Sequence, residues 1–267
     1  MSNFAKRAIF GALFVGIVIL CLYLGFGPSS FLFSVAGIIG LVEATRMTWK
    51  GRKGAFGWHL TGGAFLAFGF YLFTENVFPF VMMSCIFNLA LVVQLFKKKQ
   101  NLLTGSRIDG LVGMLYAVIP FIALLIFIDH KEPIVLLGVL IAIWSNDTFA
   151  YLIGKQFGRR KLFERISPNK TWEGSIGGAA VALLLVVLVL PMLFEQFNKV
   201  DWLFIGILSI IFGSIGDLIE SMFKRYYGVK DSGNVIPGHG GILDRFDALM
   251  GAAPFVLAYC YLADYLG

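Results

Sequence analysis

Long apolar stretches separated by short polar segments run through the whole sequence. A membrane-crossing helix needs about 20 apolar residues, whereas a strand of a membrane barrel alternates apolar and polar positions over about 10. Here the apolar stretches are unbroken at the helical length, so we predict an all-α, polytopic integral membrane helical bundle of about nine transmembrane helices. The predicted spans are 8–26, 29–45, 55–73, 77–96, 108–128, 134–153, 175–194, 202–222 and 246–266.

The composition agrees with this prediction. Of the 267 residues, 58% are hydrophobic and 14% charged, whereas a soluble domain carries roughly 25% charged residues. A soluble globular enzyme, a disordered protein and a disulfide scaffold are therefore excluded. The three cysteines lie inside apolar stretches without metal-site spacing and are interpreted as small buried hydrophobic residues.

The positive charges report the sidedness of the chain. Of the 22 lysines and arginines, 20 fall on alternating loops. By the positive-inside rule those loops are cytoplasmic, which places the N-terminus inside and the C-terminus outside. We therefore expect an integral protein of a bacterial inner (cytoplasmic) membrane with its active site facing the cytoplasm. The net charge of +6 is explained by topology, and no nucleic acid partner is expected.

Carboxylates inside the apolar stretches are candidates for function, because a charged side chain is costly in a membrane. Four acids lie there: Glu43, Asp147, Asp217 and Glu220. Glu43 precedes Arg46 by three residues, at ion-pair spacing, and is interpreted as a structural pair. Two further carboxylates, at 244 and 247, lie where the chain enters the last span and share one helical face. Three helices thus bring carboxylates to a similar depth on the cytoplasmic side.

Clustered carboxylates beside cations are typical of chemistry on phosphates. Carboxylates hold Mg²⁺, and the metal together with lysine or arginine neutralises phosphate oxygens. The segment 224–247 contains a glycine-rich loop whose backbone N–H groups can approach an anion. An ion-coupled transporter would use the acids but has no need of a glycine-rich basic loop. That segment carries five basic side chains, Lys224, Arg225, Lys230, His239 and Arg245.

These segments resemble the signature of the phosphatidate cytidylyltransferases, also called CDP-diacylglycerol synthases. The matching runs are Ser221-Met-Phe-Lys-Arg225, Lys230-Asp-Ser-Gly233, Pro237-Gly-His-Gly-Gly241 and Asp244-Arg-Phe-Asp247. A second pattern, Asp147-Thr-Phe-Ala-Tyr151 with Ser167-Pro-Asn-Lys-Thr-Trp-Glu-Gly174, is also similar to that family. The specific part covers the C-terminal half. We therefore expect one membrane domain, 1–267, in which residues 1–130 form a scaffold and residues 131–267 carry the site.

The resemblance implies that the protein transfers the cytidylyl group of CTP to phosphatidate with Mg²⁺, releasing pyrophosphate, in phospholipid biosynthesis. Asp217, Asp244 and Asp247 are assigned to the metal and the catalytic cluster, with Asp147 either as a further member of the site or as a polar residue that orients it. Glu220 is expected to pair with Lys224 at i+4. The candidates for contact with phosphate or substrate are Lys170, Ser221, Lys224, Arg225, Lys230, His239, Gly240, Gly241 and Arg245.

Two alternatives stay open at this point. A CTP-dependent polyprenol or lipid kinase would release CDP, and an ion-coupled transporter would turn over no nucleotide. The sequence also leaves open a second cation such as K⁺ and a homodimer. Membrane lipid, CTP and phosphatidate are the expected partners.

Overall fold

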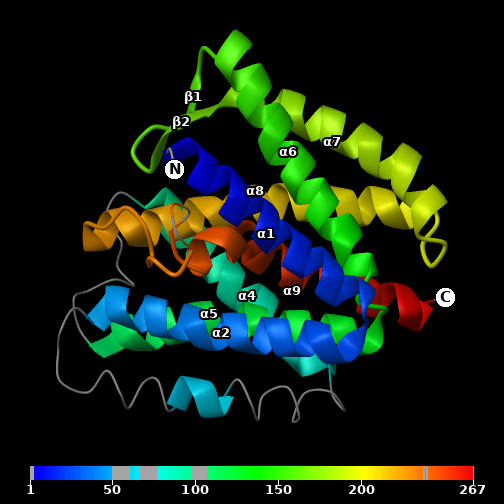
Figure 1. The fold of residues 1–267 in the computed structure, drawn as a ribbon, viewed down its shortest axis with the longest axis horizontal. Coiled ribbons are helices and arrows are strands. Elements are labelled where there is room, and N and C mark those ends of the chain that lie inside the picture. Colours follow the sequence, from blue (N-terminus) through cyan, green and yellow to red (C-terminus); the bar gives the residue numbers. More distant parts are fainter. Residues whose placement is uncertain are drawn as a thin grey trace.

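A computed structural model describes residues 3–49, 61–65, 77–97, 107–236, 238 and 240–266 of the chain. Most of the predicted third span, 55–73, and the predicted site residue His239 lie outside these residues. Figure 1 shows a bundle of long helices. Their bounds are α1 (Asn3–Tyr23), α2 (Phe26–Trp49), α4 (Val77–Phe96), α5 (Arg107–His130), α6 (Val135–Phe157), α7 (Trp172–Leu193), α8 (Lys199–Tyr227) and α9 (Leu243–Leu266).

The helices confirm the prediction of a polytopic, predominantly helical membrane protein. Among the described residues, seven helices are long and apolar enough to cross a membrane, namely α2 and α4 to α9. The apolar part of α1, Ala8–Tyr23, is shorter. Helix α4 has the bounds that the sequence predicts, and the other described helices differ from their predicted spans by up to five residues at either end. The count of nine spans stays a prediction.

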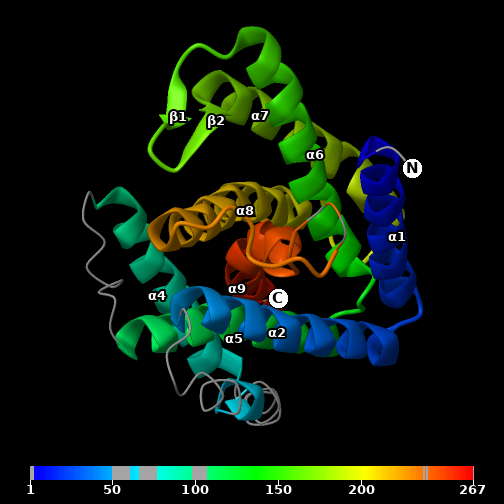
Figure 2. The ribbon, with the colours of Figure 1, turned by 60° about the vertical axis from the view of Figure 1, so that its left-hand side comes forward.

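Helices α8 and α9 pack against each other in the middle of the bundle. The pair α6 and α7 lies on one side of them, and the pair α2 and α5 lies on the other (Figure 2). Figure 1 places the N-terminus, the β-hairpin and the loop after α8 towards one end of the molecule, with the C-terminus at the other. These three parts of the chain, which the sequence assigns to a single side of the membrane, thus lie at a common end.

The contact between α8 and α9 depends on two glycines. A β-carbon at Gly216 of α8 would lie 2.9 Å from Gly251 Cα of α9, which is closer than real β-carbons approach. Small residues at a helix crossing let the two backbones touch. Gly213 and Gly216 lie in one apolar stretch of the sequence, which predicts such an approach at both positions. It is confirmed at Gly216, whereas a β-carbon at Gly213 would make only ordinary contacts of 3.4 Å and more.

A two-stranded hairpin joins α6 to α7 and departs from an all-α fold. Strand β1 (Lys161–Phe163) pairs antiparallel with β2 (Ser167–Thr171). The sequence predicts only a bent segment here. The residue before a proline favours extended backbone, and this preference at Ser167, before Pro168, fits the start of the strand. The Thr171 side chain then caps α7 by accepting a hydrogen bond from the Gly174 N–H at 3.2 Å.

Candidate active site

Three carboxylates meet where α8 and α9 cross. One oxygen each of Asp217, Glu220 and Asp247 lies within 4.8 Å of the other two. Asp217 and Glu220 share a face of α8 because they are three residues apart, and the glycine crossing brings Asp247 of α9 to that face. Glu220 is fully buried, and its Oε1 has no hydrogen-bond partner among the described residues. We refer to these three residues as the carboxylate triad.

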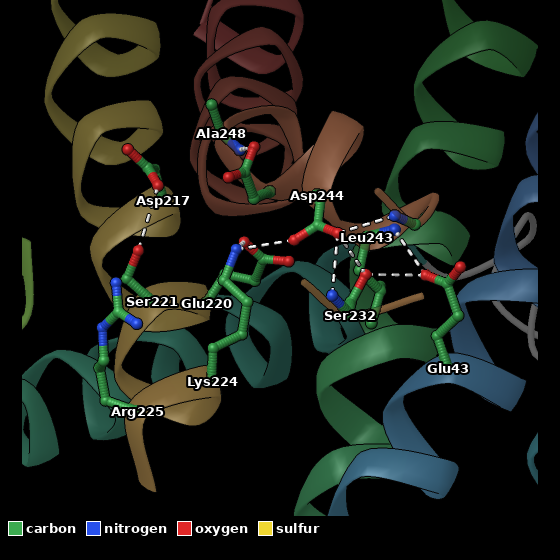
Figure 3. A network of polar contacts seen from close by, with 12 residues as sticks. Glu43, Asp217, Glu220, Ser221, Lys224, Arg225, Ser232, Leu243, Asp244 and Ala248 are labelled. Atoms are coloured by element: carbon green, nitrogen blue, oxygen red, sulfur yellow. Dashed lines mark hydrogen bonds and ion pairs between the residues drawn. The ribbon is translucent and has the colours of Figure 1, made fainter. Parts of the chain in front are cut away.

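Lys224 is the internal counter-ion of this region. Its Nζ lies 2.5 Å from Glu220 Oε2 and 2.7 Å from Asp244 Oδ1 (Figure 3). The predicted i+4 pair between Glu220 and Lys224 is therefore confirmed. The lysine side chain is 14% exposed, so it is held between two carboxylates rather than extended into solvent as a free phosphate contact.

Asp244 lies beside the triad but is not a member of it. Its Oδ2 accepts hydrogen bonds from the backbone N–H of Gly241 at 2.7 Å, from the N–H of Ser232 at 2.9 Å and from the Ser232 hydroxyl at 3.0 Å. Asp244 lies in the first turn of α9, where the glycine-rich loop supplies these donors. Of the three predicted metal ligands, Asp217 and Asp247 thus lie together with Glu220, and Asp244 is joined to this group through Lys224.

Lys170 closes the other side of the triad. It lies on β2 and forms an ion pair with Asp217. Burial of the ammonium group favours the neutral form, but the Asp217 carboxylate outweighs this effect and raises the pKa of Lys170 above its ordinary value. Asp147 of α6 is close enough to interact electrostatically with both partners. The predicted residues Asp147, Lys170 and Asp217 are thus close in space although they come from three elements.

The other predicted contacts lie around this centre. The Ser221 hydroxyl is 3.5 Å from Asp217 Oδ1. The Arg225 Nε donates to the carbonyl of Ile166 at 3.4 Å and so ties α8 to the hairpin. Lys230 and Arg245 are exposed, and Arg245 lines a cavity of about 220 Å³ beside α1 and α6. Gly240 adopts φ of 84°, in the left-handed region that favours glycine.

Glu43 does not form the predicted ion pair. Arg46 is exposed, and no ion pair joins the two residues in the part of the chain that the structure describes. Both carboxylate oxygens of Glu43 instead accept hydrogen bonds from the glycine-rich loop and the start of α9. The local spacing was misleading because the true partners lie about 200 residues away.

A larger cavity opens where α6 meets the hairpin and α7. Its volume is about 880 Å³, and Arg159, Arg160 and Trp172 line it together with exposed apolar side chains. The Glu173 carboxylate there accepts hydrogen bonds from the backbone N–H groups of Arg159 and Arg160 at 2.9 and 3.1 Å. These hydrogen bonds use only the backbone of Arg159 and Arg160, and both residues are exposed.

Comparison with known proteins identifies the family. The sequence profile of the cytidylyltransferase family matches residues 5–263, which is nearly the whole chain. The chain belongs to the cytidylyltransferase family. Family membership excludes neither metal nor lipid chemistry, but it makes a transporter an unsupported interpretation of the acid cluster.

Curated relatives carry a more specific name. The protein named phosphatidate cytidylyltransferase of Staphylococcus aureus (strain COL) is 49% identical over 123 residues, covering 45% of this chain and 46% of that protein. The protein of the same name of Bacillus subtilis (strain 168) is 48% identical over 116 residues, covering 43% of each chain. The aligned part thus spans less than half the length of these relatives.

Two residues of this region are understated or missed by the sequence. Glu220 is among the acids of the apolar stretches that are candidates for function, but it is assigned only a pairing with Lys224, although its i+3 spacing from Asp217 indicates that it shares the same face. Ser232 was not singled out. Its hydroxyl lies between Glu43 and Asp244, and no local sequence pattern predicts this connection.

Proposed function

We propose that this protein is a phosphatidate cytidylyltransferase. It takes the cytidylyl group from CTP and attaches it to phosphatidate, giving CDP-diacylglycerol and pyrophosphate. The observation that carries the proposal is the carboxylate triad with Lys170 and Lys224 on either side of it, in a chain of the cytidylyltransferase family. The names of the relatives support phosphatidate as the acceptor.

The donor set of the triad fits a divalent cation such as Mg²⁺. Hard oxygen ligands suit Mg²⁺, and the buried Glu220 Oε1 has no partner among the described residues. The region holds five carboxylates, from Asp147, Asp217, Glu220, Asp244 and Asp247, against the two ammonium groups of Lys170 and Lys224. If all are ionised, three negative charges are left without a counter-charge, which is costly in a membrane protein. We infer that Asp217, Glu220 and Asp247 hold the metal, while a second cation such as K⁺ stays a prediction.

The reaction requires one bond to form and one to break. A phosphate oxygen of phosphatidate attacks the α-phosphorus of CTP, and the bond between the α-phosphorus and the bridging oxygen breaks as pyrophosphate departs with the electron pair. The phosphatidate oxygen is already anionic, so no strong base is needed. When bound, Mg²⁺ supplies positive charge to the phosphate oxygens.

The protein residues then have two tasks. Lys170 stays protonated beside Asp217 and offers an N–H donor at the entrance of the site, where its side chain is 25% exposed. Such preorganised cations stabilise charge that develops on phosphate oxygens. Lys224 balances the buried Glu220 and Asp244 and so keeps the two central helices in register.

We also infer that this end of the bundle faces the cytoplasm, with nine spans and the N-terminus inside. The alternation of basic loops supports this orientation. CTP is supplied from water and phosphatidate from the membrane, so the site must be reachable from both. A homodimer stays a prediction.

The proposal is tested with the purified full-length protein in detergent. It is incubated with α-³²P-labelled CTP, phosphatidate and Mg²⁺, and lipid-extractable label and pyrophosphate are measured. We expect equal amounts of labelled lipid and pyrophosphate. Release of CDP with an unlabelled phospholipid product would instead indicate a CTP-dependent kinase, and no turnover of CTP would overturn the proposal.

A further inference from the structure

Glu43 reaches from α2 into the loop that precedes α9. Its side chain is buried, with 4% of the residue exposed. Oε1 accepts a hydrogen bond from the Ile242 N–H at 3.0 Å, and Oε2 accepts one from the Leu243 N–H at 3.0 Å. The Ser232 hydroxyl lies 3.0 Å from the same Oε2 (Figure 3). A residue of the N-terminal half therefore binds two separate parts of the 229–242 loop region.

These hydrogen bonds satisfy donors that α9 cannot satisfy itself. The first N–H groups of a helix have no partner within it, and the N-terminal end of the helix dipole favours a negative charge. The Glu43 carboxylate supplies both the acceptors and the charge. It acts as a cap that comes from another helix rather than from the preceding loop.

Two glycines of the loop are explained by the same carboxylate. A β-carbon at Gly233 would lie 2.7 Å from the carboxyl carbon of Glu43, and one at Gly241 would collide with the carboxylate oxygens. The loop therefore wraps closely around Glu43 from both sides. This fit is hard to reconcile with a side chain that merely fills space in the bundle.

A continuous polar chain leads from Glu43 to the carboxylate triad. The Ser232 hydroxyl lies 3.0 Å from both Glu43 Oε2 and Asp244 Oδ2, and Asp244 Oδ1 accepts from Lys224, which also binds Glu220. The hydroxyl has one hydrogen and can donate it to only one carboxylate at a time. When it donates to Glu43, Ser232 remains bound to Asp244 through its backbone N–H at 2.9 Å.

We propose that Glu43 is a positioning residue for the active site. By fixing the loop and the first turn of α9, it sets the position of Asp244 and through it the Lys224–Glu220 pair. Helix α2 of the N-terminal half then takes part in shaping the active site and is more than a scaffold. The effect on turnover rests on the proposed function, whereas the anchoring of the loop does not.

The central test is Glu43→Gln. In either orientation of the amide, its –NH₂ group faces the N–H of Ile242 or Leu243. Because two donors cannot pair, one of the two capping hydrogen bonds is lost together with the negative charge. Two matched controls are Glu195→Gln, at an exposed glutamate, and Leu22→Ala, which removes a buried side chain of α1 and lowers stability without touching the loop.

The first readout is independent of activity. Trypsin cleavage after the exposed Lys230 is followed by mass spectrometry on folded protein in detergent. Glu43→Gln should speed this cleavage at least tenfold relative to wild type and Glu195→Gln. Leu22→Ala should leave the Lys230 rate unchanged at a temperature equally far below its own Tm. Unchanged cleavage in Glu43→Gln would overturn the anchoring.

The second readout is turnover per folded molecule. Loss of an outer hydrogen-bond partner of a metal site typically costs about 10- to 100-fold in activity or metal affinity, so Glu43→Gln should lower kcat in that range and raise the Mg²⁺ concentration for half-maximal rate. A lower Tm with unchanged kcat and Mg²⁺ dependence would show a structural role only.

A double variant tests the hydrogen-bonded path from Glu43 through Ser232 to Asp244. Adding Ser232→Ala to Glu43→Gln should lower kcat little further, and fully additive losses of kcat would contradict this path. If the wild type forms no CDP-lipid but the cleavage result holds, only the proposed function fails.

Discussion

Lys224 of α8 lies 2.7 Å from Asp244 of α9 and joins the two central helices about two turns away from the contact between Gly216 and Gly251. The same ammonium lies 2.5 Å from the fully buried Glu220. One cation therefore balances one carboxylate of the triad and one that holds the loop. This arrangement couples the stability of the α8–α9 contact to the electrostatics of the site.

Replacing Lys224 with methionine should therefore damage both folding and activity. Removing one partner of a buried ion pair costs about 3–5 kcal/mol because the other charge is left uncompensated. We expect a clearly lower Tm in detergent and loss of CDP-lipid formation. Lys230→Met, at an exposed lysine, should keep the wild-type Tm. Equal Tm values for the two variants would refute the buried-pair interpretation.

The glycine crossing makes a second prediction. At Gly216 an alanine β-carbon would meet the backbone of Gly251 at 2.9 Å, so α8 and α9 must move apart, at a cost of about 1–3 kcal/mol for overpacking. Gly216→Ala should lower the Tm and separate Asp217 from Asp247. The matched control is Gly16→Ala of α1, where a β-carbon meets nothing within 4 Å. It should be neutral or stabilising because alanine favours helix more than glycine. Similar Tm values for both alanine variants would contradict the close crossing.

The helices were predictable from sequence because the length of an apolar stretch is a local property. The approach at Gly216 was also predictable, since small residues on an apolar helix indicate a contact. The orientation of Asp244 was not, because it is decided by N–H donors of a loop that folds back onto the helix. Glu43 shows the limit most clearly. Its spacing to Arg46 offered a sufficient local explanation, while its partners Ile242 and Leu243 lie about 200 residues away.

The orientation in the membrane is tested by labelling. Single cysteines placed in the loops 155–170 and 226–240 should react with an impermeant maleimide only when it reaches the cytoplasmic face. The native cysteines, at 21, 85 and 260, are partly or fully buried and are replaced beforehand. Labelling of either loop from outside in intact cells would overturn the proposed topology.

Lys170 should act as a permanent cation over the working pH range. Its pKa is raised above the ordinary value of 10.5, so the stabilisation by the Asp217 pair is fully present below that value and is lost only as the pH rises through the higher folded pKa. The Tm difference between wild type and Lys170→Met should therefore not decrease as the pH rises from roughly 6 to 9, because lysine remains charged there. A difference that shrinks with rising pH in this range would show that Lys170 loses its proton.

Comparing Lys170 with Arg159 distinguishes a cation of the proposed site from a cation of the surface. Lys170→Ala removes the partner of Asp217 and should cost activity even in neutral detergent. Arg159→Ala removes an exposed guanidinium at the rim of the 880 Å³ cavity and should matter far less there. Equal losses of CDP-lipid formation would mean that the rim arginine belongs to the site as much as Lys170 does.

The carboxylate triad makes the most direct prediction. Asp217→Asn, Glu220→Gln and Asp247→Asn each keep the shape of the side chain and remove one negative charge. Because an amide is less costly than an unpaired charge in this setting, the variants should fold. Removing an essential electrostatic group typically costs about 10²–10³-fold in rate, and we expect that loss together with a higher Mg²⁺ requirement. Glu164→Gln, in the exposed hairpin turn, is the matched control.

Asp244→Asn tests whether holding the loop and forming the carboxylate triad are separate roles. Asp244 holds the loop and Lys224 and lies outside the triad, so its loss should lower kcat and also speed trypsin cleavage after Lys230, as in Glu43→Gln. The triad variants should leave that cleavage unchanged. If well-folded Asp217→Asn and Asp247→Asn kept most of the wild-type activity at low Mg²⁺, the triad could not be the metal site, and the charge excess at the α8–α9 crossing would need another counter-ion.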